Sequence, residues 1–144
     1  MTKWNKKNFI VSAKQNCKAH ISKTILELVK YAEQESDLIS WGRGDGYGTM
    51  TFKCQSDDYG LLPLFHITTN GQIKFQLHFL RTKITKKEIL HDYQLKLESN
   101  FMIDFDEESY SSDTFFPISD LFTIHQEVEK FMDTIQSITS RLKQ

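Results

Sequence analysis

The side chains best suited to chemistry are two histidines, His66 and His78, which lie in neighbouring segments of alternating polarity. Imidazole titrates near neutral pH and binds metal ions, so two histidines on one face of adjacent strands can share a substrate or a metal. His66-Ile67-Thr68 matches the His-x-Thr element of a two-histidine phosphoesterase, but His78-Phe79-Leu80 lacks the hydroxyl that such a site uses to bind phosphate. We therefore interpret both histidines as polar side chains on the face of a sheet.

No other reactive groups form a recognisable catalytic or metal-binding motif in the sequence. Four carboxylates gather in one stretch, at Asp104, Asp106, Glu107 and Glu108. Clustered oxygen ligands suit Mg²⁺ or Ca²⁺, but the stretch lacks the spacing of a calcium loop, and we interpret it as a solvated acidic loop. No Gly-x-Ser-x-Gly turn is present, and Cys17 and Cys54 are far apart. We predict no catalytic residue, no metal, no cofactor and no cleavage of DNA.

A glycine-rich segment runs from Gly42 to Gly48, with four glycines in seven residues. A phosphate-binding loop opens a helix, because the helix N-terminus supplies the anion site, whereas here we expect a helix before the loop and a strand after it. The main expected role is to turn the backbone above a mostly buried Trp41, whose indole would hold the loop in place. If the loop instead contacts a ligand or partner, the candidate residues are Trp41, Arg43, Asp45 and Tyr47.

Basic residues gather in two places. One cluster comprises Arg81, Lys83, Lys86 and Lys87, and the other is the N-terminus, where six lysines precede the first acidic residue, Glu27. The two clusters could join to contact nucleic-acid phosphates. The alternative is that both are ordinary surface charge that keeps the protein soluble.

Composition predicts one domain over residues 1–144, with residues 1–8 as a loosely ordered basic arm. The formal net charge is −1, and apolar residues make up 39% of the chain, enough for one core. The first residues lack the apolar run of a signal peptide, and no apolar stretch is long enough to cross a bilayer. The two cysteines have no disulfide or metal-ligand spacing, so we expect free thiols. We expect a cytoplasmic protein with no membrane contact, whose oligomeric state the sequence leaves open.

Hydrophobic periodicity predicts an α+β fold, with a three-stranded antiparallel sheet and about three helices on one face. The expected strands cover about 48–55, 61–68 and 72–80, and the expected helices cover 16–34, 85–99 and the region after Pro117. Phe9-Ile10-Val11 is expected to form a short strand or an arm. A three-residue loop with Gly71 left-handed would pair Ile67 with Ile73, and Thr85 to Glu88 has the form of a capping box. Phe101-Met102-Ile103 reads as a brief strand.

Several motifs along the chain are similar to those of one known family. They are Trp41-Gly42-x-Gly44, Tyr47-Gly48-Thr49, Leu64-Phe65-x-Ile67, Gly71-x-Ile73-x-Phe75 and Pro117 with Leu121. The chain resembles, over roughly residues 24–138, an uncharacterised bacterial domain found alone or C-terminal to restriction-endonuclease-like nuclease modules. That resemblance implies partner or nucleic-acid recognition in a DNA-processing or defence setting, and it carries no catalytic residue.

The function expected from these observations is a non-catalytic binding or interaction module whose partner is a protein or nucleic acid. The alternative is a small-ligand-binding protein or an enzyme that uses the Gly42–Gly48 loop together with His66 and His78.

Overall fold

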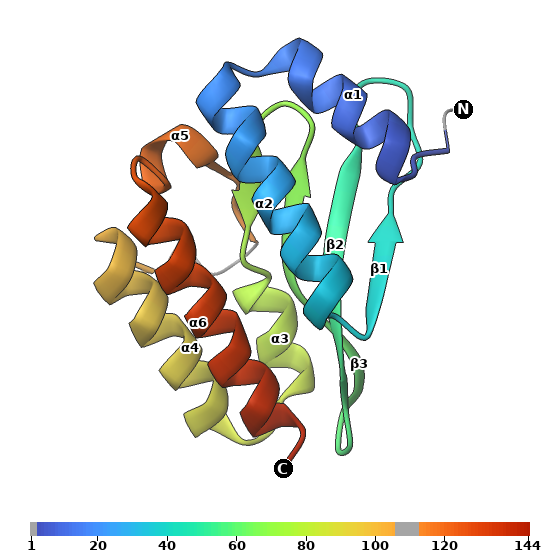
Figure 1. Ribbon diagram of the computed structural model, residues 1–144. Coiled ribbons are helices and arrows are strands. Elements are labelled where there is room, and N and C mark those ends of the chain that lie inside the picture. The colour runs from blue at the N-terminus through green and yellow to red at the C-terminus, as the bar shows by residue number, and fades with distance from the viewer. Residues whose placement is uncertain (1–2, 106–112) are drawn as a thin grey trace.

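A computed structural model describes residues 3–105 and 113–144 and shows an α+β fold (Figure 1). The helices are α1 (Lys6–Asn16), α2 (Ala19–Glu35), α3 (Leu77–Lys83), α4 (Lys87–Phe101), α5 (Ile118–Leu121) and α6 (His125–Leu142). The strands are β1 (Leu38–Trp41), β2 (Thr49–Ser56), β3 (Gly60–Thr68), β4 (Gln72–Lys74) and β5 (Phe116–Pro117). The α+β class is therefore confirmed.

The sheet has five strands, in the order β1-β2-β3-β4-β5, where the sequence predicted three. Each strand pairs antiparallel with its neighbour. The hairpin from β3 to β4 has the predicted register, with Ile67 opposite Ile73 and Gly71 left-handed at φ 83°. β1 and β5 were missed because strands of four and two residues are too short to show a clear alternation.

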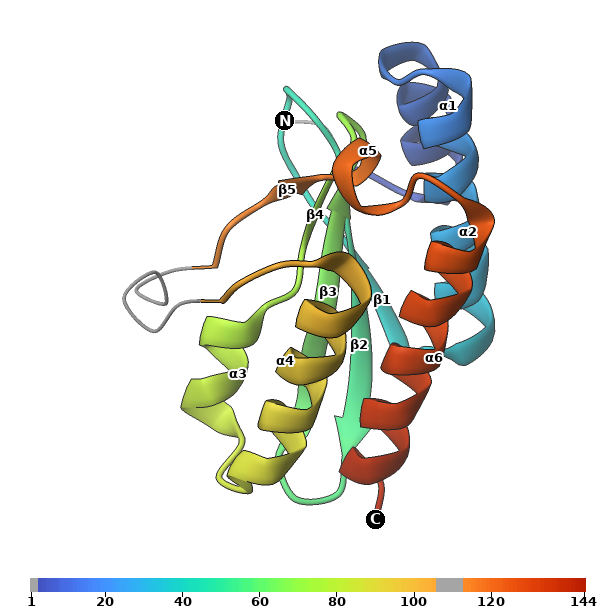
Figure 2. The ribbon, with the colours of Figure 1, turned by 90° about the vertical axis from the view of Figure 1, so that its left-hand side faces the viewer.

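Three helices, α1, α2 and α6, lie on one side of the sheet, as the turned view shows (Figure 2). Phe52 of β2 stacks on Tyr31 of α2, with ring centroids 5.8 Å apart, and on Phe65 of β3 at 5.2 Å. Phe65 in turn meets the edge of Phe131 of α6 at 4.9 Å. This run of aromatic rings joins the helix layer to the sheet and forms the centre of the core.

The strand predicted over 72–80 is wrong beyond Lys74. Gln76 takes a left-handed conformation at φ 61°, and α3 begins at Leu77. Leu77 and Leu80 are both buried, and their spacing of three residues suits a helix. The residues around them alternate in polarity, which suits a strand equally well. The Asp113 carboxylate decides between the two, because it accepts the N–H groups of His78 and Phe79 in the first turn of the helix.

The N-terminal prediction is also wrong, because Phe9, Ile10 and Val11 lie in α1 rather than in a strand or arm. Asn5 caps this helix: its side chain accepts the Asn8 N–H at 3.0 Å, and the Asn8 side chain accepts the Asn5 N–H at 2.7 Å. Two asparagines thus do the work of a Ser/Thr–Glu capping box. The helix predicted over 16–34 begins three residues later, at Ala19.

The second half of the chain follows the prediction more closely. α4 forms as expected, but its predicted capping box does not, because the Thr85 hydroxyl contacts the Tyr59 hydroxyl instead. Phe101 ends α4, so the brief strand predicted at 101–103 is absent. The long final helix is confirmed as α6, but it begins at His125 rather than directly after Pro117, where the separate short helix α5 forms. No helix within residues 3–105 and 113–144 has the length and apolarity needed to cross a membrane.

Candidate functional site

The base of the glycine loop is held by Trp4. Its indole Nε1–H donates to the Gly44 carbonyl at 2.9 Å, and its backbone N–H donates to the Gly42 carbonyl at 3.2 Å. A Cβ on Gly48 would lie 2.6 Å from the Trp4 ring, so this position admits no side chain. The indole contact expected of Trp41 is thus made by the other tryptophan, whereas Trp41 is partly buried against Phe9, with ring centroids 5.3 Å apart.

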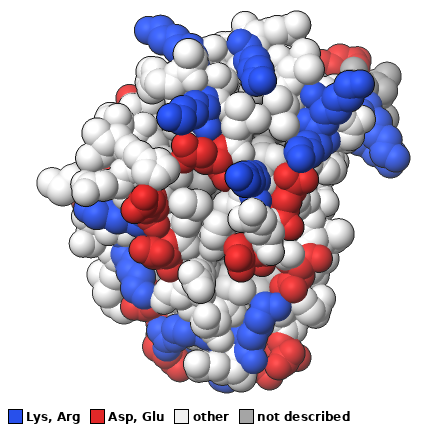
Figure 3. Space-filling view, in the orientation of Figure 1, with Lys and Arg blue, Asp and Glu red and all other residues white. Residues whose placement is uncertain are grey.

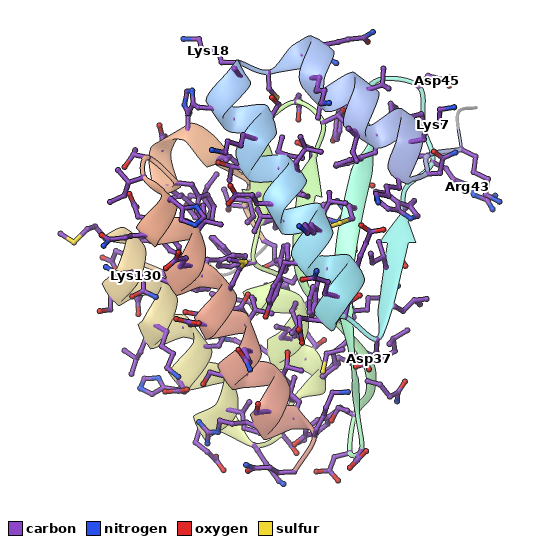
Figure 4. All side chains as sticks on the ribbon, in the orientation of Figure 1. Lys7, Lys18, Asp37, Arg43, Asp45 and Lys130 are labelled. Atoms are coloured by element: carbon purple, nitrogen blue, oxygen red, sulfur yellow. The ribbon has the colours of Figure 1, made fainter. Side chains whose placement is uncertain are left out.

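The far side of the loop is joined to the β3–β4 turn. Thr69 makes both contacts: its hydroxyl accepts the Gly48 N–H at 2.9 Å, and its backbone N–H donates to the Gly48 carbonyl at 3.0 Å. The tip residues Arg43, Asp45 and Tyr47 all remain exposed. The loop is therefore a fixed turn that presents three side chains to solvent at the α1 end of the molecule, where Figure 4 labels Arg43 and Asp45.

His66 lies in a polar contact on the face of the sheet away from the core. Its Nδ1 is 2.6 Å from the Thr51 hydroxyl, and its ring is 5.8 Å from that of Phe115. Burial, and secondarily the charge of Lys74, lowers the pKa of His66 to about 4, so the imidazole is neutral at pH 7. A hydroxyl beside a neutral imidazole has the composition of a nucleophile and base, but Thr51 is buried, 8% exposed, in the middle of a strand.

The two histidines do not form the predicted pair. His66 is on β3, but His78 lies in the first turn of α3 and lines a different surface, the groove between α3 and α4. His78 is also far from the glycine loop, because α3 and the loop lie at opposite ends of the molecule (Figures 1 and 2), whereas His66 lies opposite Thr51, three residues beyond Gly48. Within the described residues, no group of three or more His, Cys, Asp or Glu side chains is placed to hold a metal ion.

The predicted nucleic-acid residues gather in part. Arg81, Lys83 and Lys87 line the groove between α3 and α4, whereas Lys86 turns away to Asp58, with Nζ 3.3 Å from its carboxylate oxygen. They do not join the N-terminal lysines, because this groove is remote from α1 (Figure 1). The acidic residues Asp106, Glu107 and Glu108 fall outside the described part of the chain, whereas Asp104 is exposed.

The strongest charge feature is one end of the molecule, which we call the N-terminal basic surface. It comprises Lys3, Lys6, Lys7, Lys14, Lys18, Lys23 and Arg43, all of them exposed. Figure 3 shows mainly blue side chains over this end, with some red beside them at the upper right, and mixed blue and red ones below. The first 26 residues hold six lysines and no acidic residue, so all 19 acidic residues share the rest of the chain with the other 12 basic ones.

Folding of α1 gives these charges their arrangement. Phe9 and Ala13, four residues apart, bury one side of α1 in the core. Lys7, Val11 and Lys14 follow helical spacing on the opposite side, where Val11 is 48% exposed. An isolated antiparallel bridge between Lys3 and Arg43 joins the segment before α1 to the glycine loop. The lysines that the sequence placed on a loose arm are therefore held on an ordered surface.

Several cations elsewhere in the described part of the molecule lie in ion pairs. Lys143 lies 2.8 Å from Asp37, Lys96 lies 3.1 Å from Asp92, and Arg141 lies 3.6 Å from the same Asp92 carboxylate. On the N-terminal basic surface, Lys6 is the one residue that forms an ion pair with a described side chain, Glu33, at 2.9 Å. Like charges that lack such partners repel one another, so this surface retains a positive potential.

Sequence reasoning missed Trp4 altogether, because its partners lie 40 residues away. The signal for the basic surface was present as the acid-free stretch before Glu27, but its order became evident only with α1. Comparisons of the chain with protein-family models, with curated proteins and with solved structures find no significant match.

Proposed function

We propose that this protein is a non-catalytic nucleic-acid-binding module that contacts the phosphate backbone through the N-terminal basic surface. The observation that supports this most strongly is the gathering of seven exposed cations on and just before α1, around the start of α2 and on the glycine loop, one of them in an ion pair within the described residues. Each lysine placed near a phosphate releases condensed counterions, which is the main source of sequence-independent affinity.

A phosphate backbone suits this surface better than a membrane does. A helix that binds a bilayer needs an apolar side to insert between the lipids, but the apolar side of α1, with Phe9 and Ala13, is already packed in the core. Val11 and Tyr47, 48% and 47% exposed, are single side chains among cations. The resemblance to a domain that accompanies nuclease modules points to the same class of partner, and the binding would serve a DNA-processing or defence role.

The direct test is binding to a fluorescein-labelled double-stranded oligonucleotide, followed by fluorescence anisotropy at low salt. Lys7→Glu combined with Lys14→Glu reverses two charges on the exposed side of α1, and we expect at least about 10-fold weaker binding. A single-stranded oligonucleotide of the same length shows whether the surface distinguishes the two forms.

The matched control reverses two charges at the other end of the molecule, Lys83→Glu with Lys87→Glu. All four lysines are exposed, so both double variants should fold, which circular dichroism verifies. We expect the control to bind DNA nearly as tightly as the wild type. Equal loss in both variants would reduce the effect to net charge, and loss in the control alone would move the nucleic-acid site to α3 and α4.

A further inference from the structure

The groove between α3 and α4 is a second candidate surface, separate from the basic end of the molecule. Its volume is about 940 Å³, at the upper end of the usual range for binding sites. Apolar side chains in its lining are Ile84, Leu90 and Phe105, and Ile84 and Leu90 are at most 5% exposed, so they form a fixed floor. Phe105 packs edge-on against Phe75 at 6.3 Å.

The charged side chains in the described lining of this groove are all basic. Arg81 and Lys83 come from α3 and Lys87 from the first turn of α4, and none of the eleven described residues that line the groove is acidic. The carboxylate of Asp92, also on α4, faces α6 instead, where it pairs with Arg141 at 3.6 Å. The groove is therefore positive around an apolar floor.

We infer that this groove binds an acidic peptide segment of a protein partner, with carboxylates beside Lys83 and Lys87 and one large apolar side chain on the floor. The three cations come from two different helices, α3 and α4, which suits carboxylates spaced along a chain. Interfaces of this kind obtain orientation from charge complementarity and affinity from a buried apolar anchor. The binding is independent of the proposed nucleic-acid contact, because it uses the opposite end of the molecule.

The test uses fluorescein-labelled short peptides in which Glu and Asp residues flank a Leu and a Phe, with the full-length protein, measured by fluorescence anisotropy. Two comparison peptides separate the two contributions: one has Gln and Asn in place of the acids, and one has Ser in place of Leu and Phe. We expect each to bind at least about 10-fold more weakly than the parent peptide. Binding of all three peptides with equal affinity would overturn the inference.

Variants place the binding on the protein. Lys83→Glu with Lys87→Glu should weaken the parent peptide by at least about 10-fold, whereas Lys7→Glu with Lys14→Glu should change its affinity by less than about 2-fold. Lys83→Gln with Lys87→Gln should fall between the wild type and the reversed variant. If the α1 variant loses the peptide and the groove variant keeps it, the peptide binds the N-terminal basic surface and the groove inference fails. DNA binding measured on the same variants tests the proposed function separately.

Discussion

Trp4→Ala removes the side chain that holds the glycine loop, and its effect can be worked out from the contacts of Trp4. The indole is 9% exposed, donates a hydrogen bond to Gly44 and lies against Gly48. Truncating a buried tryptophan costs about 3–5 kcal/mol, and the lost hydrogen bond is part of that cost. Because the substitution leaves the sheet core intact, we expect a loss at the lower end of that range, about 3 kcal/mol.

The assay is urea unfolding followed by far-ultraviolet circular dichroism, because tryptophan fluorescence changes with the substitution itself. Trp41→Ala is the matched control. Trp41 is only partly buried and packs against Phe9 rather than on the glycines, so its removal should cost less than that of Trp4. An unchanged midpoint for Trp4→Ala, or a larger loss for Trp41→Ala, would refute the assignment of the loop contact to Trp4.

Two further predictions concern a polar side chain on the sheet, His66, and one that contacts the sheet from α4, Tyr93. The pKa of His66 is about 4 in the fold, against 6.5 for an ordinary histidine, so the unfolded chain takes up the proton first as the pH falls from about 6.5 towards 4. The unfolding free energy should fall by on the order of 2 kcal/mol over that range, a value reduced because the ring is partly exposed. His66→Gln should remove much of this pH dependence in urea melts at several pH values. An undiminished pH dependence in the variant would count against the prediction. Tyr93→Phe removes a hydroxyl that donates to the Leu64 carbonyl at 2.8 Å, and should lower the unfolding free energy by about 1–2 kcal/mol without changing DNA binding; a neutral effect in the melt would contradict the assigned contact.

Local patterns predicted the centre of the sheet well. β2 and β3 alternate in polarity, and the expected three-residue loop with Gly71 left-handed gave the correct pairing of Ile67 with Ile73. Those features depend on residues close in sequence. The end of β4 depends instead on Asp113, which accepts the His78 N–H from 35 residues away, so alternation alone extended that strand too far.

The candidate site was less predictable for a similar reason. The sequence showed that the first lysines lack acidic neighbours, but the Asn5–Asn8 cap that orders α1 differs from the Ser/Thr–Glu form, so the segment read as an arm. The two histidines were expected together because β4 was expected to reach Leu80. Once Gln76 turns the chain into α3, His78 faces the groove and the predicted pair cannot form.

The salt dependence of DNA binding tests the central claim most directly. If about four lysines of the N-terminal basic surface contact phosphates, the logarithm of the binding constant should fall with the logarithm of salt concentration with a slope of about −3 to −4. Lys7→Glu with Lys14→Glu should make that slope shallower by about 2, whereas Lys83→Glu with Lys87→Glu should leave it unchanged. A wild-type slope near zero, or the same slope in the wild type and the α1 variant, would contradict phosphate binding by this surface.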